Sequence, residues 1–205
     1  MKNENPRPRG RPRTFDRDEV LDRAIITFWA CGYSGASVDN LTDAMGINRP
    51  SLYATFGSKH GLFMEVIDRY ASTFGRLPSR AFKHNLDARK VVADFFEICI
   101  RCATSKGKPR GCLIASVATI EAEKDTQVRE KVSGMFADTD RAITDYFRAA
   151  QDDGLLSDEH DPQALARMVI SITHSIATRA RVGASRKHLS VLVNDFMAVL
   201  FPTTN

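Results

Sequence analysis

The chain has 205 residues, of which 43% are hydrophobic and 26% charged, a composition typical of a globular protein with a sizeable core. Its formal net charge is +4. The opening segment lacks an apolar stretch, and no apolar run approaches the roughly 18 residues that span a bilayer. These features argue against a secreted or membrane-spanning protein, and we expect a cytoplasmic one.

The excess positive charge lies in residues 1–15, which contain Lys2, four arginines and the single acidic residue Glu4. The sequence "PRPRGRPRTF" has little to bury, and its prolines and glycine prevent a helix, so a flexible basic arm is expected. Its side chains Arg9, Arg11 and Arg13 are suited to the narrow, negative minor groove of A·T-rich DNA. The alternative for this segment is a solvated tail.

A helix is predicted directly after the arm, because Asp16 can cap its first amides and Glu19 completes a capping box. Gly32 is expected to end this helix. Its apolar residues recur at helical spacing and predict one buried face, made of Val20, Leu21, Ala24, Ile25 and Phe28.

Two short helices follow with a tight turn between them. Ser37 is the expected N-cap of the first and Gly46 its end, while Asn48 caps the second and Pro50 stands in its first turn. Two short helices joined by a glycine turn predict a helix-turn-helix. The start of the second helix offers Asn48, Arg49 and Ser51 to base edges.

The remainder also reads as helical, without strand-like alternation, so the fold class predicted is all-α. Gly57 and Ser58 separate the helix-turn-helix from a fourth helix that begins at Lys59. Further helices are predicted over residues 87–105, 112–122, 126–152, 161–182 and 186–200.

The run "GYSGASVDNLTDAMGINRPSLYATFGSKHGLF" and the helix before it resemble the DNA-binding domain of the TetR family of bacterial regulators. The resemblance is dense over residues 17–63. It implies an N-terminal three-helix helix-turn-helix domain, residues 16–60, joined through helix 4 to an effector-binding and dimerisation domain, residues 61–205. It also implies a repressor released from its operator by a small molecule.

Carried over position by position, the resemblance implies a DNA-binding set. Ser37 becomes a phosphate contact, and Tyr53 with Lys59 becomes a clamp on the DNA backbone. Arg49 is the first choice for reading sequence, because a guanidinium can bond both O6 and N7 of guanine. Asn48 and Thr55 depart from the family, which often has Ser and His there. The base-facing edge is Arg49, Pro50 and Ser51, and Thr55 completes the clamp.

The resemblance further implies a homodimer held by the last two long helices, bound to a near-palindromic double-stranded operator. Both helices carry regular apolar stripes. The residues predicted for the interface are Leu165, Val169, Ile172, Ile176, Leu189, Leu192, Val193, Phe196 and Leu200.

An effector site is expected among the fourth to eighth helices, with the identity of the effector left open. Relatives enclose their pocket there, and buried polar groups in apolar faces need partners. The candidate lining residues are Phe63, Phe95, Phe96, Cys99, Cys112, Ser116, Phe136, Thr139 and Met168.

The cysteines leave two alternatives open. Cys112 follows "KGKPRG" at a helix start, where Lys108 and Arg110 could favour a reactive thiolate, so the effector could be thiol-reactive; otherwise Cys112 is a half-buried cap residue. Cys99 and Cys102 form a CxxC without the strand context of a thiol-disulfide enzyme. No enzyme activity, metal site or cofactor is expected. An architectural minor-groove protein that uses the AT-hook-like "RGRP" remains the alternative function.

Overall fold

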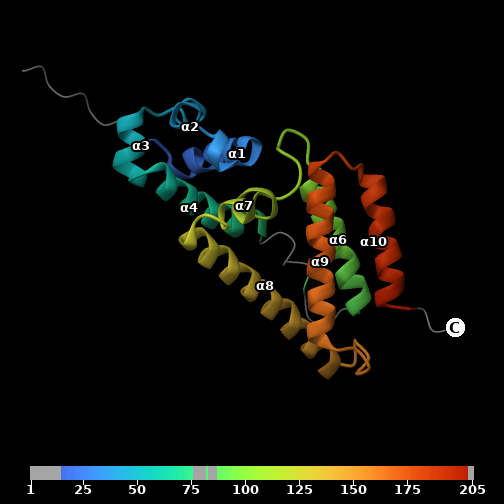
Figure 1. Ribbon diagram of the computed structural model, residues 1–205. Helices are drawn as coiled ribbons and strands as arrows, with labels where there is room; N and C mark the ends of the chain where they lie inside the picture. The colour runs from blue at the N-terminus through green and yellow to red at the C-terminus, as the bar shows by residue number, and fades with distance from the viewer. Residues whose placement is uncertain (1–14, 76–81, 83–86, 203–205) are drawn as a thin grey trace, which may run out of the picture.

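The computed structural model describes residues 15–75, 82 and 87–202, and within them all regular secondary structure is helical (Figure 1). This confirms the all-α prediction. The elements are α1 Arg17–Gly35, α2 Val38–Met45, α3 Arg49–Phe56, α4 Lys59–Tyr70, the π-helical turn η1 Ala71–Gly75, α6 Ala88–Ala103, the π-helical turn η2 Ile114–Ala118, α7 Thr119–Glu121, α8 Thr126–Asp152, α9 Pro162–Arg181 and α10 Arg186–Leu200.

Short polar side chains cap the helix starts, at the expected residue in the case of α1. The Asp16 carboxylate accepts from the amides of Asp18 and Glu19 at the start of α1. Asp125, Asp161 and Ser185 accept in the same way at the starts of α8, α9 and α10. The bounds of α8 and α10 coincide with the predicted ones, because a cap at the start and a loss of apolar periodicity at the end mark both helices.

Gly32 interrupts the helical backbone of α1 at the predicted position, and a short second helical segment follows within the same element. Its φ of 75° lies in the left-handed region, which glycine adopts without the steric penalty of a Cβ atom, and one further turn leads to Gly35. The bend brings Tyr33 against Phe63 of α4, with 4.9 Å between ring centroids. The predicted stop is therefore a break in the helical backbone, and the residue after it, Tyr33, packs against α4.

Two hydrophobic cores lie along the molecule. The first joins α1 to α4 with η2 and the start of α8, and it includes the fully buried Trp29 and Phe63. The second joins α6, α9, α10 and the end of α8, around Phe96 and Phe147. The long helix α8 contributes side chains to both cores, and Figure 1 shows its diagonal course between α4 and α9.

The division between the two cores does not fall between residues 60 and 61. Residues Leu62 to Tyr70 of α4 pack with the helix-turn-helix, and so do Leu113 and Val117 of the later chain. The helix α4, which was expected to join the two domains, thus belongs to the core of the helix-turn-helix domain. Within the described residues, no helix combines the length and apolarity that crossing a membrane requires.

Candidate DNA-binding surface and effector cavity

Two capped helices meet at a left-handed glycine to form the helix-turn-helix. Ser37 Oγ accepts from the Asn40 amide at the start of α2, and Gly46 ends α2 with φ 69°. After the turn, Asn48 Oδ1 accepts from the Ser51 amide at 2.8 Å and starts α3. The expected caps are all used, so the short helices owe their ends to local chemistry.

The helix α3 presents the predicted base-facing edge to solvent. Leu52 and Phe56 are buried and anchor it, whereas Arg49 and Pro50 are exposed at its first turn. Tyr53 is 48% exposed, one of the few large apolar side chains on the surface of the described residues. The remaining members of the predicted set are arranged around this edge: Ser37 and Asn48 are exposed, and Ser51, Thr55 and Lys59 are half-buried.

Arg49 is held by an acidic residue of the preceding helix. Its Nε donates to Asp39 Oδ1 at 2.7 Å and its Nη2 donates to Asp39 Oδ2 at 2.6 Å, which is a two-pronged contact across the turn. Hydrogen bonding to Asp39 raises the pKa of Arg49 above its usual value. This pairing was not predicted from the sequence.

Lys59, a predicted phosphate clamp, is turned toward the protein. Its ammonium nitrogen lies 4.4 Å from the centroid of the Tyr33 ring, within the range of a cation–π contact. Burial lowers the pKa of Lys59, although Glu121 nearby opposes this effect. The contact of Lys59 with the interior means that a phosphate contact would require its side chain to swing outward.

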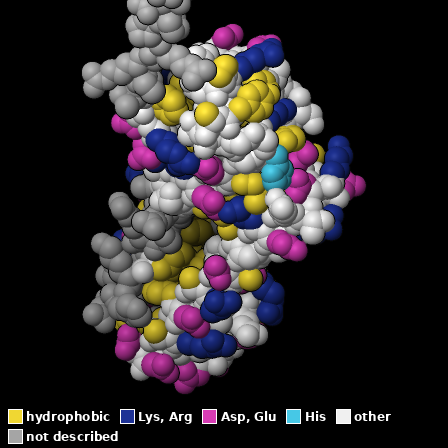
Figure 2. Space-filling view, turned by 90° about the vertical axis from the view of Figure 1, so that its left-hand side faces the viewer, with side chains coloured by type: hydrophobic (Ala, Val, Ile, Leu, Met, Phe, Trp, Pro, Cys, Tyr) yellow, Lys and Arg dark blue, Asp and Glu magenta, His cyan; other side chains and the backbone are white. Residues whose placement is uncertain are grey.

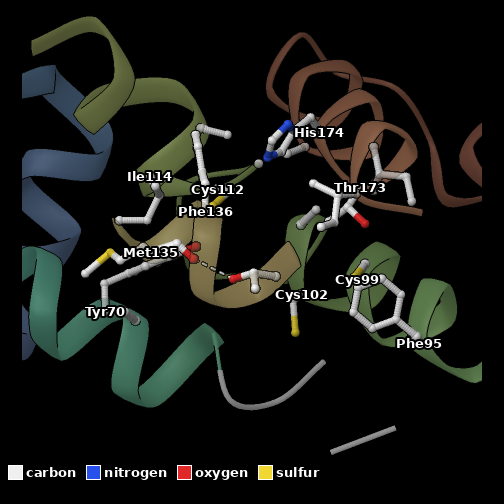
Figure 3. A pocket seen from close by; sticks show the side chains of 18 of the residues that line it. Tyr70, Phe95, Cys99, Cys102, Cys112, Ile114, Met135, Phe136, Thr173 and His174 are labelled. Carbon is white, nitrogen blue, oxygen red and sulfur yellow. Dashed lines mark hydrogen bonds between the residues drawn. The ribbon is translucent and has the colours of Figure 1, made fainter. Parts of the chain in front are cut away.

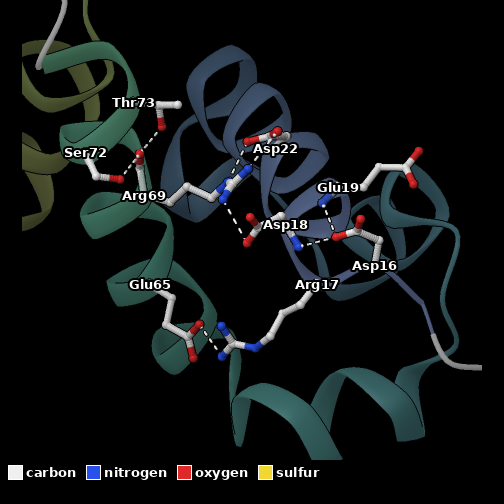
Figure 4. Close-up of polar contacts among 9 residues, drawn as sticks. All are labelled: Asp16, Arg17, Asp18, Glu19, Asp22, Glu65, Arg69, Ser72 and Thr73. Carbon is white, nitrogen blue, oxygen red and sulfur yellow. Dashed lines mark hydrogen bonds and ion pairs between the residues drawn. The ribbon is translucent and has the colours of Figure 1, made fainter.

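Ion pairs tie α4 to α1 (Figure 4). Arg69 near the end of α4 donates from Nε and Nη2 to Asp22, and its Nη1 lies 2.8 Å from Asp18. Arg17 of α1 pairs with Glu65 of α4. Since the apolar faces of the same two helices are packed together, α1 and α4 form one rigid frame for α2 and α3.

A second set of ion pairs ties α4 to α8. His60 Nε2 lies 2.9 Å from Asp125 Oδ2, and this contact is an ion pair only when the His60 ring is protonated. Near the other end of α4, Lys131 Nζ lies 2.5 Å from Asp68 Oδ1. A displacement of α8 would therefore act on both ends of α4.

A large apolar cavity of about 1120 Å³ lies between the two cores (Figure 3). Figure 2 shows its mouth as a yellow recess in the surface. The wall combines aromatic and aliphatic side chains with a few polar groups, among them Thr139, Thr173 and His174. The ring of His174 lies 5.2 Å from that of Phe136. A cavity of this size and polarity suits a drug-sized apolar ligand.

Five of the nine predicted effector residues line this cavity: Phe95, Cys99, Cys112, Phe136 and Thr139. The other four do not. Phe63 and Phe96 are fully buried in the two cores, the Ser116 hydroxyl donates to the Cys112 carbonyl, and Met168 is 48% exposed on α9. The lining residues that sequence reasoning missed include Trp29, Tyr70, Phe82, Cys102, Met135 and Tyr146.

Three thiols face the same cavity. Burial raises the pKa of Cys99 and of Cys102, so both are protonated at neutral pH. Cys112 is half-buried at the start of the helix that carries η2, and its thiol is in hydrogen-bond contact with the hydroxyl of Tyr70. Arg110, expected to activate Cys112, instead donates to the Ala184 carbonyl. Among the described residues, no group of three or more His, Cys, Asp or Glu side chains is arranged to hold a metal ion.

The structure corrects the prediction of the dimer interface, because six of the nine residues predicted for it are buried inside one protomer. These side chains lie in the second core, at 6% exposure or less: Leu165, Val169, Ile176, Leu189, Val193 and Leu200. Ile172, Leu192 and Phe196 are half-buried. The apolar stripes face α6 and α8, while other apolar residues stay on the surface: Met168 of α9, Val182 directly after α9, and Val191 and Val199 of α10.

The basic arm lies outside the described residues, so the positions of Arg9, Arg11 and Arg13 stay a prediction from the sequence. The described chain begins at Phe15, whose side chain packs against the first core beside the helix-turn-helix. The start of the described chain lies close to α3, because the Arg17 guanidinium lies over the ring of Phe56 at 5.3 Å.

Family models match both parts of the chain. The model for bacterial regulatory proteins of the TetR family matches residues 20–66, and the model for the tetracyclin repressor-like C-terminal domain matches residues 88–196. The second match alone spans more than half of the chain. The helix-turn-helix and the cavity-bearing domain are therefore each recognised independently.

Known proteins align over nearly the whole length. The HTH-type transcriptional repressor ComR of Escherichia coli K12 is 32% identical over 88% of this chain and 87% of its own. BdcR, a repressor from the same organism, is 26% identical over 88% of this chain and 86% of its own length. The solved structure of a cysteine mutant of the regulator CifR with a 26-base-pair operator superposes with a TM-score of 0.84 at 35% identity, covering 94% of this chain and all of that one. The chain therefore belongs to the TetR family and is a DNA-binding transcriptional regulator, not an enzyme.

Proposed function

We propose that the protein is a homodimeric repressor that leaves its operator when an apolar small molecule occupies the cavity. One observation carries this proposal. The helix α4 begins next to the predicted DNA clamp at Lys59 and ends at Tyr70, which lines the cavity. The same helix is tied by ion pairs to α1 and α8, so a ligand that displaces α8 would also displace the frame of the helix-turn-helix.

The proposed reading head is the first turn of α3. Arg49, Pro50 and Ser51 would face the bases in the major groove, and Ser37, Tyr53 and Thr55 would contact phosphates. Arg9, Arg11 and Arg13 of the arm would enter the adjacent minor groove and add affinity for A·T pairs. A regulator of this kind acts where the chromosome lies, which puts it in the bacterial cytoplasm.

The proposed dimer interface is the exposed side of α9 and α10. Met168, Val182, Val191 and Val199 are between 48% and 82% exposed there. Of the large hydrophobic side chains that are exposed among the described residues, only Tyr53 and Ile120 lie elsewhere. Pairing this surface with its copy would remove these apolar side chains from water, which is the usual driving force of association.

A thiol-reactive effector is the second candidate, favoured by the place of Cys112 in the cavity. A molecule that alkylates this thiol would disturb the contact with Tyr70 at the end of α4. An iodoacetamide adduct at Cys112 that leaves operator affinity unchanged would contradict this candidate and would leave reversible binding of an apolar molecule.

Selection of binding sites from random duplex DNA tests the proposed function. We expect a near-palindromic motif with half-sites one helical turn apart, about 34 to 36 Å, because two recognition helices of a dimer meet successive major grooves. Recovery of no motif, or of short A·T runs without a palindrome, would favour the architectural minor-groove alternative.

A further inference from the structure

We propose that Asp39 determines the sequence specificity of this regulator by holding the guanidinium of Arg49 in the position that reads guanine. This inference rests on the proposed function, since it assigns a role within the same reading head. Asp39 itself was not among the residues predicted to act in DNA binding. It lies in the first turn of α2, ten positions before Arg49.

Among the described residues, Asp39 is the hydrogen-bond partner of Arg49, and it leaves the outer edge of the guanidinium available. Asp39 engages Nε and one N–H of Nη2, at 2.7 and 2.6 Å. A guanidinium has five N–H donors, so both hydrogens of Nη1 and the second hydrogen of Nη2 remain. These donors form the end of the fork, which can bond O6 and N7 of one guanine at the same time.

The pair has no evident role in stability. Its two side chains are 58% and 62% exposed, and ion pairs this exposed contribute little to folding. A carboxylate on a surface that meets phosphates also repels DNA. An acidic side chain at this place is therefore expected to act through the arginine that it holds, and its position in the first turn of α2 is favoured by the helix dipole.

Preorganisation explains how such a contact gives specificity. A free arginine side chain samples many rotamers and can satisfy phosphates or other bases as well as guanine. Because Asp39 engages its Nε side, Arg49 can present only the Nη1 and Nη2 donors of its outer edge. A base other than guanine does not offer this edge two acceptors at the same time. Asp39 is thus a positioning residue, and its loss should lower discrimination between bases more than it lowers affinity.

The test uses the full chain and the operator that it selects from random duplex DNA. The dissociation constant is measured by fluorescence anisotropy at fixed salt for this operator and for versions with a guanine of each half-site replaced by 7-deazaguanine or adenine. The wild type is expected to lose about 5- to 150-fold in affinity at the guanine that Arg49 reads. Arg49→Ala should identify this position by removing the preference there.

In Asp39→Asn, the preference at that guanine is expected to fall to less than about a third of its wild-type value, by the coupling typical of residues in direct contact. In the Arg49→Ala background, Asp39→Asn should cause no further change in base preference. Asp43→Asn is the matched control, because Asp43 is an exposed carboxylate on the same helix and its replacement changes the net charge equally. It should keep the full preference.

Three results would overturn the proposal: an unchanged guanine preference in Asp39→Asn, a guanine preference that survives Arg49→Ala, or a gain in affinity for all sequences in Asp39→Asn well beyond that in Asp43→Asn. The last result would mean that Asp39 restrains Arg49 from DNA. If the wild type selects no operator at all, the proposed function fails and this inference fails with it. If the wild type binds a selected operator but Asp39→Asn keeps the full guanine preference, only the inference about Asp39 fails.

Discussion

At the scale of single residues, the cavity combines apolar walls with thiols that burial keeps protonated. Cys99 is 7% exposed, and desolvation is the main reason that its pKa is raised. Burial also raises the pKa of Tyr70 and brings that of Tyr146 to about 12. A raised pKa of an acidic group makes stability depend on pH, because the folded state keeps a proton that the unfolded state loses.

Replacing Cys99 with alanine should flatten the alkaline loss of stability. An unfolded thiol loses its proton near pH 8.5, so the stabilisation by protonated Cys99 is complete below that pH and declines as the pH rises. Between pH 8.5 and 9.5 the decline in the free energy of unfolding is expected to be about 1 kcal/mol smaller in Cys99→Ala than in the wild type. Urea denaturation at both pH values measures the difference.

Cys31→Ala is the control for this prediction, because Cys31 is an exposed free thiol of the same chain. It should leave the pH dependence unchanged, and the buried tyrosines are present in every variant. A decline in Cys99→Ala as steep as that in Cys31→Ala would contradict the assignment of a buried, protonated thiol.

At the scale of elements, the short helices of the reading head depend on their caps. The helix α3 has only the eight residues Arg49–Phe56, and a helix this short is not stable without capping contacts at its ends and packing against the rest of the domain. The Asn48 side chain accepts from the Ser51 amide in its first turn, and Gly57 in the left-handed region ends it.

Replacing the cap should destabilise the protein without touching the core. Asn48→Ala is expected to lower the free energy of unfolding by about 1 kcal/mol, and to lower the melting temperature by about 2 to 4 °C for a chain of this size. Asn48→Ser keeps a cap oxygen and should stay within about 0.5 kcal/mol of the wild type. Equal melting temperatures of the alanine and serine variants would show that the hydrogen bond to Ser51 does not stabilise α3.

Most of the fold could be predicted from the sequence, because local signals carry it. Apolar periodicity and caps gave correct bounds for α8 and α10, and the glycine turn between α2 and α3 stands where it was expected. Periodicity reports which side chains are apolar but not what covers them. For this reason Leu165 and Val193 were predicted for the dimer interface, although they pack inside one protomer.

The candidate site could be predicted only in part. The caps and the exposed edge of α3 follow from local sequence, whereas the pairing of Arg49 with Asp39 spans the turn and depends on how the two helices cross. The cavity draws its wall from elements far apart in the chain, from Trp29 to Ala177. Which apolar residues leave a space between them is a property of packing that no single segment contains.

At the scale of the whole molecule, the proposed assembly brings two reading heads to one operator. A protomer alone offers one short recognition helix. Two copies joined through α9 and α10 would add their contacts, and the second head would bind at the high effective concentration set by the first. Affinity for the operator should therefore depend on residues of α10 that are far in sequence from the reading head.

Placing a charge on the exposed face of α10 should separate the protomers. Val191→Glu combined with Val199→Glu is expected to give a monomer in sedimentation velocity and at least about tenfold weaker operator binding, since burying unpaired carboxylates in an interface opposes association. Ile120→Glu is the control, because Ile120 is also exposed, at 62%, but belongs to α7 and not to α9 or α10. A dimer that persists in the double variant would place the interface elsewhere.

The most direct test of the account is methylation interference on the selected operator. Dimethyl sulfate methylates guanine N7 in the major groove and adenine N3 in the minor groove, so it reports which groove carries the reading. We predict that methylation of guanine N7 blocks binding at equivalent positions of two half-sites about one helical turn apart. Interference confined to adenine N3 would contradict reading by α3 and would assign recognition to the arginine arm.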